Sequence, residues 1–111
     1  MLSFRKAELK DVRLYFNWTN EKLVRSQSFI SKPITFEEHN KWFLKKLLDV
    51  NTTMLIFIDG DDNIGQVRIE KFTNKQAKIG ISIQRKFRGK KYAVKMLDLA
   101  SNYFFKNNLD F

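Results

Sequence analysis

The segment from Gln84 to Ala93 concentrates residue types that bind anions. Five of the seven residues from Arg85 to Lys91 are basic, and Gly89 stands among them. Glycine lets a backbone approach its ligand closely, and lysine and arginine supply positive charge. If the segment opens a helix, the unpaired amide N–H groups of the first turn and the helix dipole add to this attraction. The segment therefore suits a diphosphate, although an ordinary exposed loop whose charges serve solubility has the same composition.

The residues on either side predict a strand before this segment and a helix after it. From Gln76 to Ile83, apolar and polar residues alternate, as they do in a half-buried strand. Residues 90–107 carry apolar side chains at helical spacing. We therefore expect the basic segment to connect this strand to this helix.

The rest of the chain predicts strands and helices in the order β-α-α-α-β-β-β-α, an α/β fold. Further strands are expected over residues 3–7, 53–59 and 63–72, with turns at 60–62 and 73–75. A helical stretch over residues 9–26 is expected to break near Asn20, which can cap a second short helix from Glu21. Thr35 and Glu38 have the spacing of a capping box and predict the start of another helix. Residues 109–111 resemble the beginning of one more strand.

Composition excludes several classes of protein and site. The longest apolar run, residues 54–58, is far shorter than the roughly 20 residues that span a bilayer. No secretion signal is recognisable at the N-terminus, so we expect a cytoplasmic protein. With no cysteine and one histidine, the chain lacks the residues for disulfides, thiol nucleophiles and a transition-metal site. A formal net charge of +9 favours anionic partners.

The order of elements and the basic segment together resemble the GNAT acyltransferase superfamily. Its motif A has the pattern Arg/Gln-x-x-Gly-x-Gly/Ala, in which Arg88 matches the first position and Ala93 the last. Lys91 stands where the pattern has glycine. The resemblance covers the whole chain but only the N-terminal two-thirds of such a domain. Residues 1–111 are therefore interpreted as the N-terminal part of one GNAT domain, with a mixed sheet whose C-terminal strands are missing.

This resemblance implies acetyl-CoA as cosubstrate and direct attack of an amine on its thioester. The end of the fourth strand would pair with the pantetheine arm, at Ile81, Ser82 and Ile83. The pyrophosphate would lie on the segment that comprises Arg88, Gly89, Lys90, Lys91, Tyr92, Ala93 and Val94. A backbone N–H near Ile83 would donate to the developing oxyanion. The tyrosine that often protonates the leaving thiolate in this family lies beyond the end of this chain.

Candidates for proton transfer and acceptor binding are fewer. Glu70 could act as general base directly or through water, but its alternation with apolar neighbours equally fits a solvent-facing side chain. His39 lies three residues before Trp42 on the predicted helix, so it could contact substrate, transfer a proton or simply pack on Trp42. Arg25 could bind a substrate phosphate or pair with Glu21. Trp18 fits the core better than a ligand contact.

Two functions from different classes follow from these patterns. The first is acetyl transfer to a primary amine, because several segments look like GNAT enzymes that acetylate amino sugars on nucleotide carriers. These segments are Trp18-Thr19-Asn20, Val24-Arg25, Ser28-Phe29, Ile34-Thr35 and Glu38-His39-x-x-Trp42-Phe43. They are also similar to ribosomal-protein N-terminal acetyltransferases, but a charge of +9 would repel a basic protein. The second is a non-catalytic nucleic-acid-binding module, which the lack of interleaved exposed aromatics disfavours. Self-association into a homodimer is also open.

Overall fold

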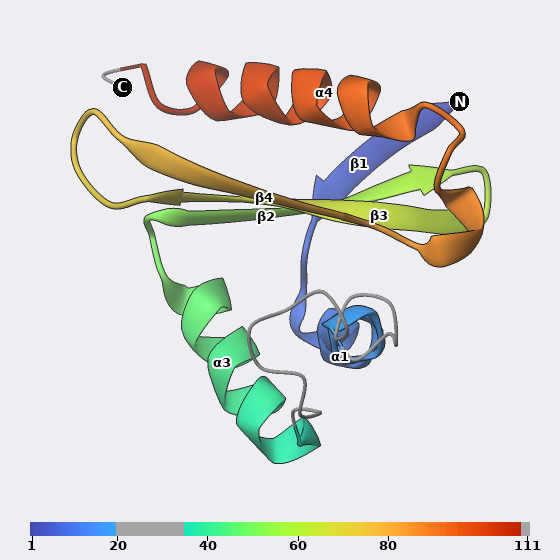
Figure 1. The fold of residues 1–111 in the computed structure, drawn as a ribbon. Coiled ribbons are helices and arrows are strands. Elements are labelled where there is room, and N and C mark those ends of the chain that lie inside the picture. The colour runs from blue at the N-terminus through green and yellow to red at the C-terminus, as the bar shows by residue number, and fades with distance from the viewer. Residues whose placement is uncertain (20–34, 110–111) are drawn as a thin grey trace. The chain divides into compact units, whose positions relative to one another are not determined.

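The computed structural model describes residues 1–19 and 35–109, which divide into two compact units (Figure 1). The sheet unit comprises residues 1–7 and 50–111, and the helical unit comprises residues 8–49. The expected break at Asn20, the expected helix from Glu21 and the last two residues of the chain lie outside the described residues. Each unit is described by itself.

The sheet unit contains a four-stranded antiparallel sheet covered on one face by a helix (Figure 1). Its strands, in spatial order, are β1 (Leu2–Lys6), β2 (Thr52–Asp59), β3 (Asp62–Lys71) and β4 (Ala77–Ile83). The short 3-10 helix η2 (Arg85–Phe87) follows β4 and leads to the covering helix α4 (Tyr92–Lys106). These bounds confirm the predicted strands to within a residue or two. The described part of the predicted mixed sheet consists of antiparallel pairs alone.

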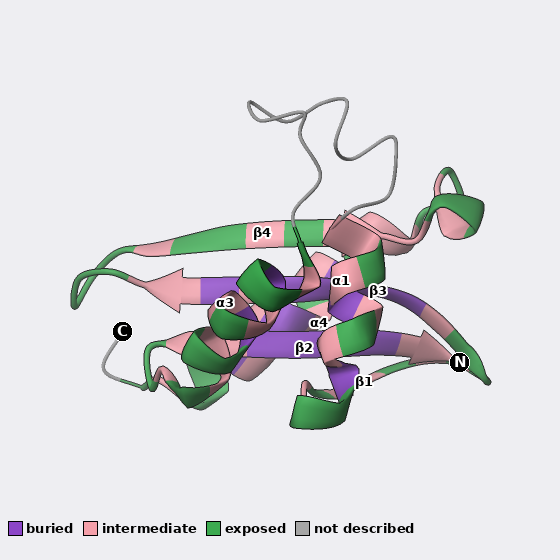
Figure 2. Cartoon of the chain, turned by 90° about the horizontal axis from the view of Figure 1, so that it is seen from below, coloured by how far each residue is buried: buried purple, intermediate pink, exposed green. Residues whose placement is uncertain are grey.

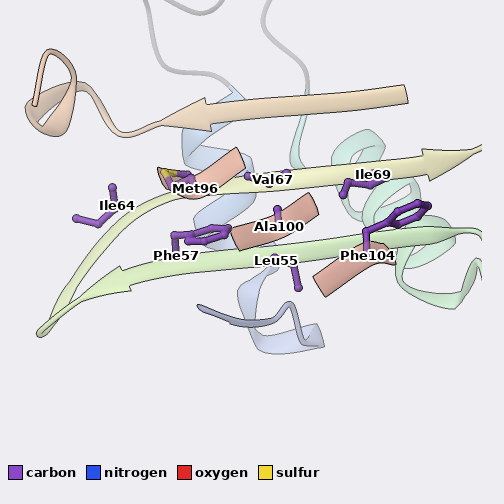
Figure 3. Packing of buried hydrophobic residues seen from close by; sticks show 8 residues of the cluster. All are labelled: Leu55, Phe57, Ile64, Val67, Ile69, Met96, Ala100 and Phe104. Atoms are coloured by element: carbon purple, nitrogen blue, oxygen red, sulfur yellow. The ribbon is translucent and has the colours of Figure 1, made fainter. Parts of the chain in front are cut away.

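The core of the sheet unit lies between α4 and the central strands (Figure 3). Strand alternation turns Leu55 and Phe57 of β2, and Val67 and Ile69 of β3, toward one face. Four-residue spacing places three side chains of α4 on the face that meets them. These are Met96, Ala100 and Phe104. Burying each large apolar side chain contributes about 1.5–3 kcal/mol, so this layer fixes α4 across the sheet.

Strand β4 lies at one edge of the sheet, beside β3, and it is more exposed than β2 or β3 (Figure 2). The predicted burial of alternate residues holds only in part, because Ile79 is 50 % exposed and Ile81 is 37 % exposed, whereas Gly80 and Ser82 between and beside them are half-buried. Within the described residues, no further strand pairs with β4 on the side away from β3. Its outer backbone groups are therefore available for new hydrogen bonds.

The described residues of the helical unit form a 3-10 turn and two α-helices packed through aromatic side chains. These elements are η1 (Leu9–Asp11), α1 (Val12–Thr19) and α3 (Phe36–Leu48). Phe16 of α1 meets Phe36 edge-on with ring centroids 5.2 Å apart, and Tyr15 meets Phe43 at 4.9 Å. The guanidinium carbon of Arg13 lies 4.1 Å from the Phe36 ring centroid, so a cation–π contact adds to this interface.

The predicted cap at Thr35 is present in modified form. The Glu38 amide donates to Thr35 Oγ1 at 3.2 Å, as a capping box requires. The Glu38 carboxylate accepts from the Thr35 hydroxyl, with Oγ1 and Oε1 2.9 Å apart. The Glu38 amide in the first turn of α3 is thus satisfied by the side chain of Thr35.

Gly65 allows β3 and β4 to approach closely just before the basic loop, which we define as residues 84–91. Gly65 pairs with Ile83, and a Cβ added to it would lie 2.1 Å from the Ser82 carbonyl oxygen. That distance is far below van der Waals contact, and the obstructing atom belongs to backbone. A larger residue at this position would have to push the end of β4 away from β3.

We predict that Gly65→Ala lowers the free energy of unfolding by about 3 kcal/mol, because the new methyl group overpacks backbone that cannot rotate away. Chemical denaturation measures the change. Gly80→Ala is the matched control, since its Cβ would meet only the Arg68 side chain, at 3.7 Å, and should change stability by less than about 1 kcal/mol. Equal stability of the two variants would contradict the close approach.

Candidate functional site

The basic loop enters α4 through two residues in the left-handed region. Gly89 has φ 78°, and Lys91, which occupies the N-cap position of α4, has φ 65° and ψ 26°. The Lys91 side chain forms no capping hydrogen bond, so the amides of the first turn of α4 are not satisfied by an N-cap side chain. The start of α3, by contrast, is closed by Thr35. An uncapped helix start beside five basic residues is a favourable place for an anion.

Lys91 keeps the backbone shape that glycine would give the loop. The left-handed conformation costs a residue with a Cβ about 1–2 kcal/mol, and Lys91 is the one non-glycine residue with positive φ among the described residues. The turn at the glycine position of the motif is therefore retained, with strain in its backbone. The helix expected from residue 90 begins at Tyr92 for the same reason.

Arg88 attaches the basic loop to the end of β4. Its Nε atom donates to the Ile83 carbonyl oxygen at 2.9 Å, and its side chain is half-buried. Arg88 therefore helps to shape the loop between β4 and α4.

Alternation along β4 determines which backbone groups face outward. Gln84 donates to the Ile64 carbonyl at 2.7 Å, which marks these residues as a hydrogen-bonded pair. Because such pairs alternate in antiparallel ladders, the backbone of Ser82 points toward β3, whereas Ile81 and Ile83 point theirs away. Of the three residues predicted to pair with pantetheine, Ile81 and Ile83 thus present amides at the open edge.

Ser82 contributes to the sheet through its side chain. Gln66 Nε2 donates to Ser82 Oγ at 3.0 Å across the β3–β4 pair. Gln66 is 7 % exposed, and its Oε1 atom has no hydrogen-bond partner within the described residues. The hydroxyl of Ser82 is thereby oriented toward β3 at the face opposite α4.

Glu70, the first candidate base, is engaged in an ion pair on β3. Its Oε1 atom lies 2.6 Å from Arg68 Nε, and the two side chains are about one-quarter exposed. The Arg68 guanidinium therefore already occupies one oxygen of the Glu70 carboxylate.

His39, the second candidate, lies on α3 within an aromatic cluster. The side chain is 2 % exposed, with ring centroids 5.5 Å from Trp42 and 5.5 Å from Phe16. Burial lowers the pKa of His39 below its usual 6.5, and a hydrogen bond with the Val12 backbone opposes that shift. The imidazole is therefore neutral at pH 7. Its Nε2 atom has no partner among the residues that the structure describes.

The remaining acceptor-side predictions concern Trp42, Trp18 and Arg25. Trp42 is half-buried beside His39, and Trp18 meets the Tyr15 ring edge-on at 5.7 Å. Arg25 lies outside the described residues. The two units are described separately, so these side chains are not placed relative to the basic loop.

Two open hollows lie toward the other end of α4. One of about 680 Å³ is lined by residues that include Asn51, Lys71 and Asn107. The other, of about 420 Å³, lies between Ile79 of β4 and Phe105 of α4. Neither is lined by residues of the basic loop.

Residues 1–19 and 35–109 contain no group of three or more His, Cys, Asp or Glu side chains able to hold a metal ion. Within the same ranges, no helix combines the length and the apolar character needed to cross a membrane.

Sequence reasoning missed one residue next to the loop, Asp59. The sequence predicts it only as the last residue of the strand over 53–59, yet its carboxylate accepts from the Tyr92 hydroxyl at 2.8 Å. The sequence carries no signal for this contact, because it depends on how far α4 extends over the β2–β3 hairpin.

Comparison with known proteins identifies the class. A family model described as an acetyltransferase (GNAT) domain matches residues 1–110. The chain therefore belongs to the GNAT acetyltransferase family, as its motif and element order predicted.

Individual relatives are more distant. Acetyltransferase PseH of Campylobacter jejuni is 26 % identical over 117 residues, covering 96 % of this chain and 74 % of that protein. Spermidine N-acetyltransferase from Vibrio cholerae, in complex with CoA and spermine, is 25 % identical with a TM-score of 0.80. That match covers 95 % of this chain and 64 % of the Vibrio chain, so this chain spans less than two-thirds of it. A Methanocaldococcus jannaschii domain shares the fold at 23 % identity and a TM-score of 0.80, over 96 % of this chain and 71 % of that one.

We predict that Lys91→Gly raises the free energy of unfolding by about 1 kcal/mol, because glycine adopts positive φ without strain. CoA affinity should stay equal or improve, as isothermal titration would measure. Lys90→Gly is the matched control: it removes the same charge from the same loop, but Lys90 has no positive φ to relieve. A loss of CoA affinity of tenfold or more in Lys91→Gly, about 1.4 kcal/mol, would show instead that the Lys91 ammonium binds a phosphate.

Proposed function

We propose that this chain provides the donor-binding part of an acetyl-CoA-dependent N-acetyltransferase that acts on a primary amine. The observation that carries the proposal is the uncapped start of α4, entered through Gly89 and Lys91 and surrounded by basic side chains. Membership of the GNAT family and the CoA bound in the Vibrio cholerae structure support it.

In this proposal the two ends of the cosubstrate occupy different parts of the sheet unit. The diphosphate lies on the first-turn amides of α4, at residues 89–94, where the helix dipole and the lysines stabilise it. The pantetheine arm, which carries amide groups, adds to the open edge of β4 as a short strand would, using the outward amides of Ile81 and Ile83. Arg88 joins the two regions, since it lies in the basic loop and its Nε atom donates to the Ile83 carbonyl oxygen.

The reaction needs an unprotonated amine, an oriented thioester and a stabilised oxyanion. The amine nitrogen attacks the carbonyl carbon, the C–N bond forms, and the C–S bond then breaks to release the CoA thiolate. The outward amide of Ile83 is the proposed donor to the oxyanion. Acetyl-CoA supplies the acetyl group, and the chain supplies position and charge.

Two side chains remain proposed for removing the proton of the substrate ammonium. His39 is neutral at pH 7 because of its lowered pKa, and its Nε2 atom has a lone pair to accept a proton. Glu70 would act through water, because Arg68 already occupies one carboxylate oxygen.

For the acceptor we propose a nucleotide-linked amino sugar. Such a molecule carries a diphosphate, and a protein of net charge +9 attracts it together with acetyl-CoA. Arg25 and Trp42 are the proposed contacts, one for phosphate and the other for stacking on a ring. The likeness to acetyltransferase PseH is consistent with a small-molecule acceptor.

A polyamine, the kind of acceptor named for the Vibrio cholerae relative, is the second candidate. A polycation requires carboxylates to bind it, but three carboxylates in the described part of the helical unit have local partners. Glu37 lies 4.0 Å from Lys41, Asp11 accepts from the Glu8 amide at 2.7 Å, and Glu38 accepts from Thr35. These contacts favour the anionic acceptor. Ribosomal-protein N-termini are a further alternative acceptor. Binding of nucleic acid without catalysis is an alternative function, and self-association through the edge of β4 is a separate possibility.

The test is an acetyl-transfer assay in which released CoA thiol is measured for a panel of acceptors. The panel contains UDP-linked 4-amino sugars, spermidine and basic N-terminal peptides. We expect turnover with a nucleotide-linked sugar, and Arg88→Glu should weaken acetyl-CoA binding at least tenfold, about 1.4 kcal/mol.

Lys106→Glu is the control variant, because it makes the same charge change on an exposed side chain at the other end of α4. It should leave acetyl-CoA binding within about twofold of the unaltered protein. Turnover confined to spermidine or to peptides would contradict the proposal that the acceptor is a nucleotide-linked amino sugar. Salt-dependent retention on DNA without retention on immobilised acetyl-CoA would overturn the enzymatic function.

A further inference from the structure

A single carboxylate ties the start of α4 to the β2–β3 hairpin. The Tyr92 hydroxyl donates to Asp59 Oδ2 at 2.8 Å, and the Met1 amino group donates to Asp59 Oδ1 at 3.0 Å. Asp59 is the last residue of β2, and Tyr92 is the first residue of α4. The bond therefore joins the hairpin directly to the helix turn that carries the proposed diphosphate site.

The ring of Tyr92 is held as well as its hydroxyl. It meets Phe87 edge-on, with ring centroids 6.2 Å apart, and it packs against the core of the sheet unit. Phe87 and Tyr92 thus bracket residues 88–91, the part of the loop with two left-handed residues. Because a strained Lys91 backbone favours other conformations, contacts on either side of it are needed to hold the turn in one shape.

The charge of Asp59 is opposite to what an anion site requires. A carboxylate near the start of α4 repels a diphosphate, so direct attraction does not explain its position. Its hydrogen bonds to the amino terminus and to Tyr92 lower the pKa of Asp59, and the pKa of Tyr92 is raised by the bond to Asp59. At neutral pH the contact is a protonated phenol that donates to an ionised carboxylate, a comparatively strong kind of hydrogen bond.

We propose that Asp59 and Tyr92 form a positioning pair that fixes the first turn of α4 in the geometry that binds the diphosphate of CoA. Neither Asp59 nor the Tyr92 hydroxyl needs to touch the ligand for this role. The inference rests on the proposed function, because it assumes that the amides of this turn bind CoA.

Three variants test the pair by isothermal titration with CoA. Tyr92→Phe removes the hydroxyl and keeps the ring, and Asp59→Ala removes the acceptor. Each should weaken CoA binding about fivefold, and the double variant should lose no more than either single one, because the two side chains act through one bond. Asp59→Asn, which keeps an acceptor oxygen, should restore most of the affinity.

The sign of the Asp59→Ala effect separates positioning from charge. Removing a negative charge near the site should by itself strengthen the binding of an anion. Asp61→Ala is the matched control, since it removes the same charge from an exposed residue of the same hairpin; it should leave CoA affinity equal or slightly higher. Tyr103→Phe controls for loss of a tyrosine hydroxyl elsewhere on α4.

A readout without CoA shows whether the pair orders the turn. Amide hydrogen exchange of residues 91–94 should become faster in Tyr92→Phe and in Asp59→Ala than in the two control variants. If the unaltered protein binds CoA and both variants bind it equally well, the positioning role is wrong. If the unaltered protein binds no CoA, the proposed function is overturned, and unchanged exchange rates would then overturn the pair as well.

Discussion

The amide N–H groups of the first turn of α4 impose the constraint on which the site depends. A helix start leaves these donors without backbone partners, and a protein satisfies them with a side chain, water or a ligand. At α3 the chain uses Thr35 for this purpose, whereas at α4 the N-cap position is Lys91, which provides no acceptor. An anion is the partner that such an arrangement suits, and the surrounding lysines and arginines strengthen the same preference.

The sheet determines where that helix start lies. Gly65 lets the end of β4 approach β3. Ile83, which pairs with Gly65, directs its backbone groups toward the open edge. The Arg88 bond to the Ile83 carbonyl then turns the chain toward α4. The core between α4 and the central strands then fixes the helix that follows this turn. The edge amides of β4 and the first turn of α4 therefore belong to one continuous stretch of backbone, residues 81–94.

Much of this arrangement could be predicted from local sequence. Alternation marked β4, four-residue spacing marked the buried face of α4, and the basic residues marked the loop between them. Lys91 could be recognised as a departure from the motif, but the sequence could not tell whether its backbone would keep the left-handed turn. That outcome depends on the neighbouring contacts of Arg88 and Tyr92.

Other parts of the site depend on register and packing between distant segments. The ion pair of Arg68 with Glu70, which sets the charge environment of a candidate base, is an exception, because alternation along β3 places residues two apart on the same face. Burial of His39 among aromatic rings, which lowers its pKa, follows from how α1 meets α3. The Asp59 contact with Tyr92 joins residues 33 positions apart in the sequence. Single-sequence patterns describe faces of elements, and these contacts arise only when the faces meet.

Mapping backbone amides during a titration with CoA tests the central claim most directly. In a nitrogen–proton NMR spectrum, the amides of residues 89–94 should show the largest shifts, followed by those of Ile81 and Ile83 at the open edge of β4. The amide of Ser82, which points toward β3, should move less than its two neighbours. Shifts confined to the far end of α4, or no saturable shifts in the folded protein, would contradict the account.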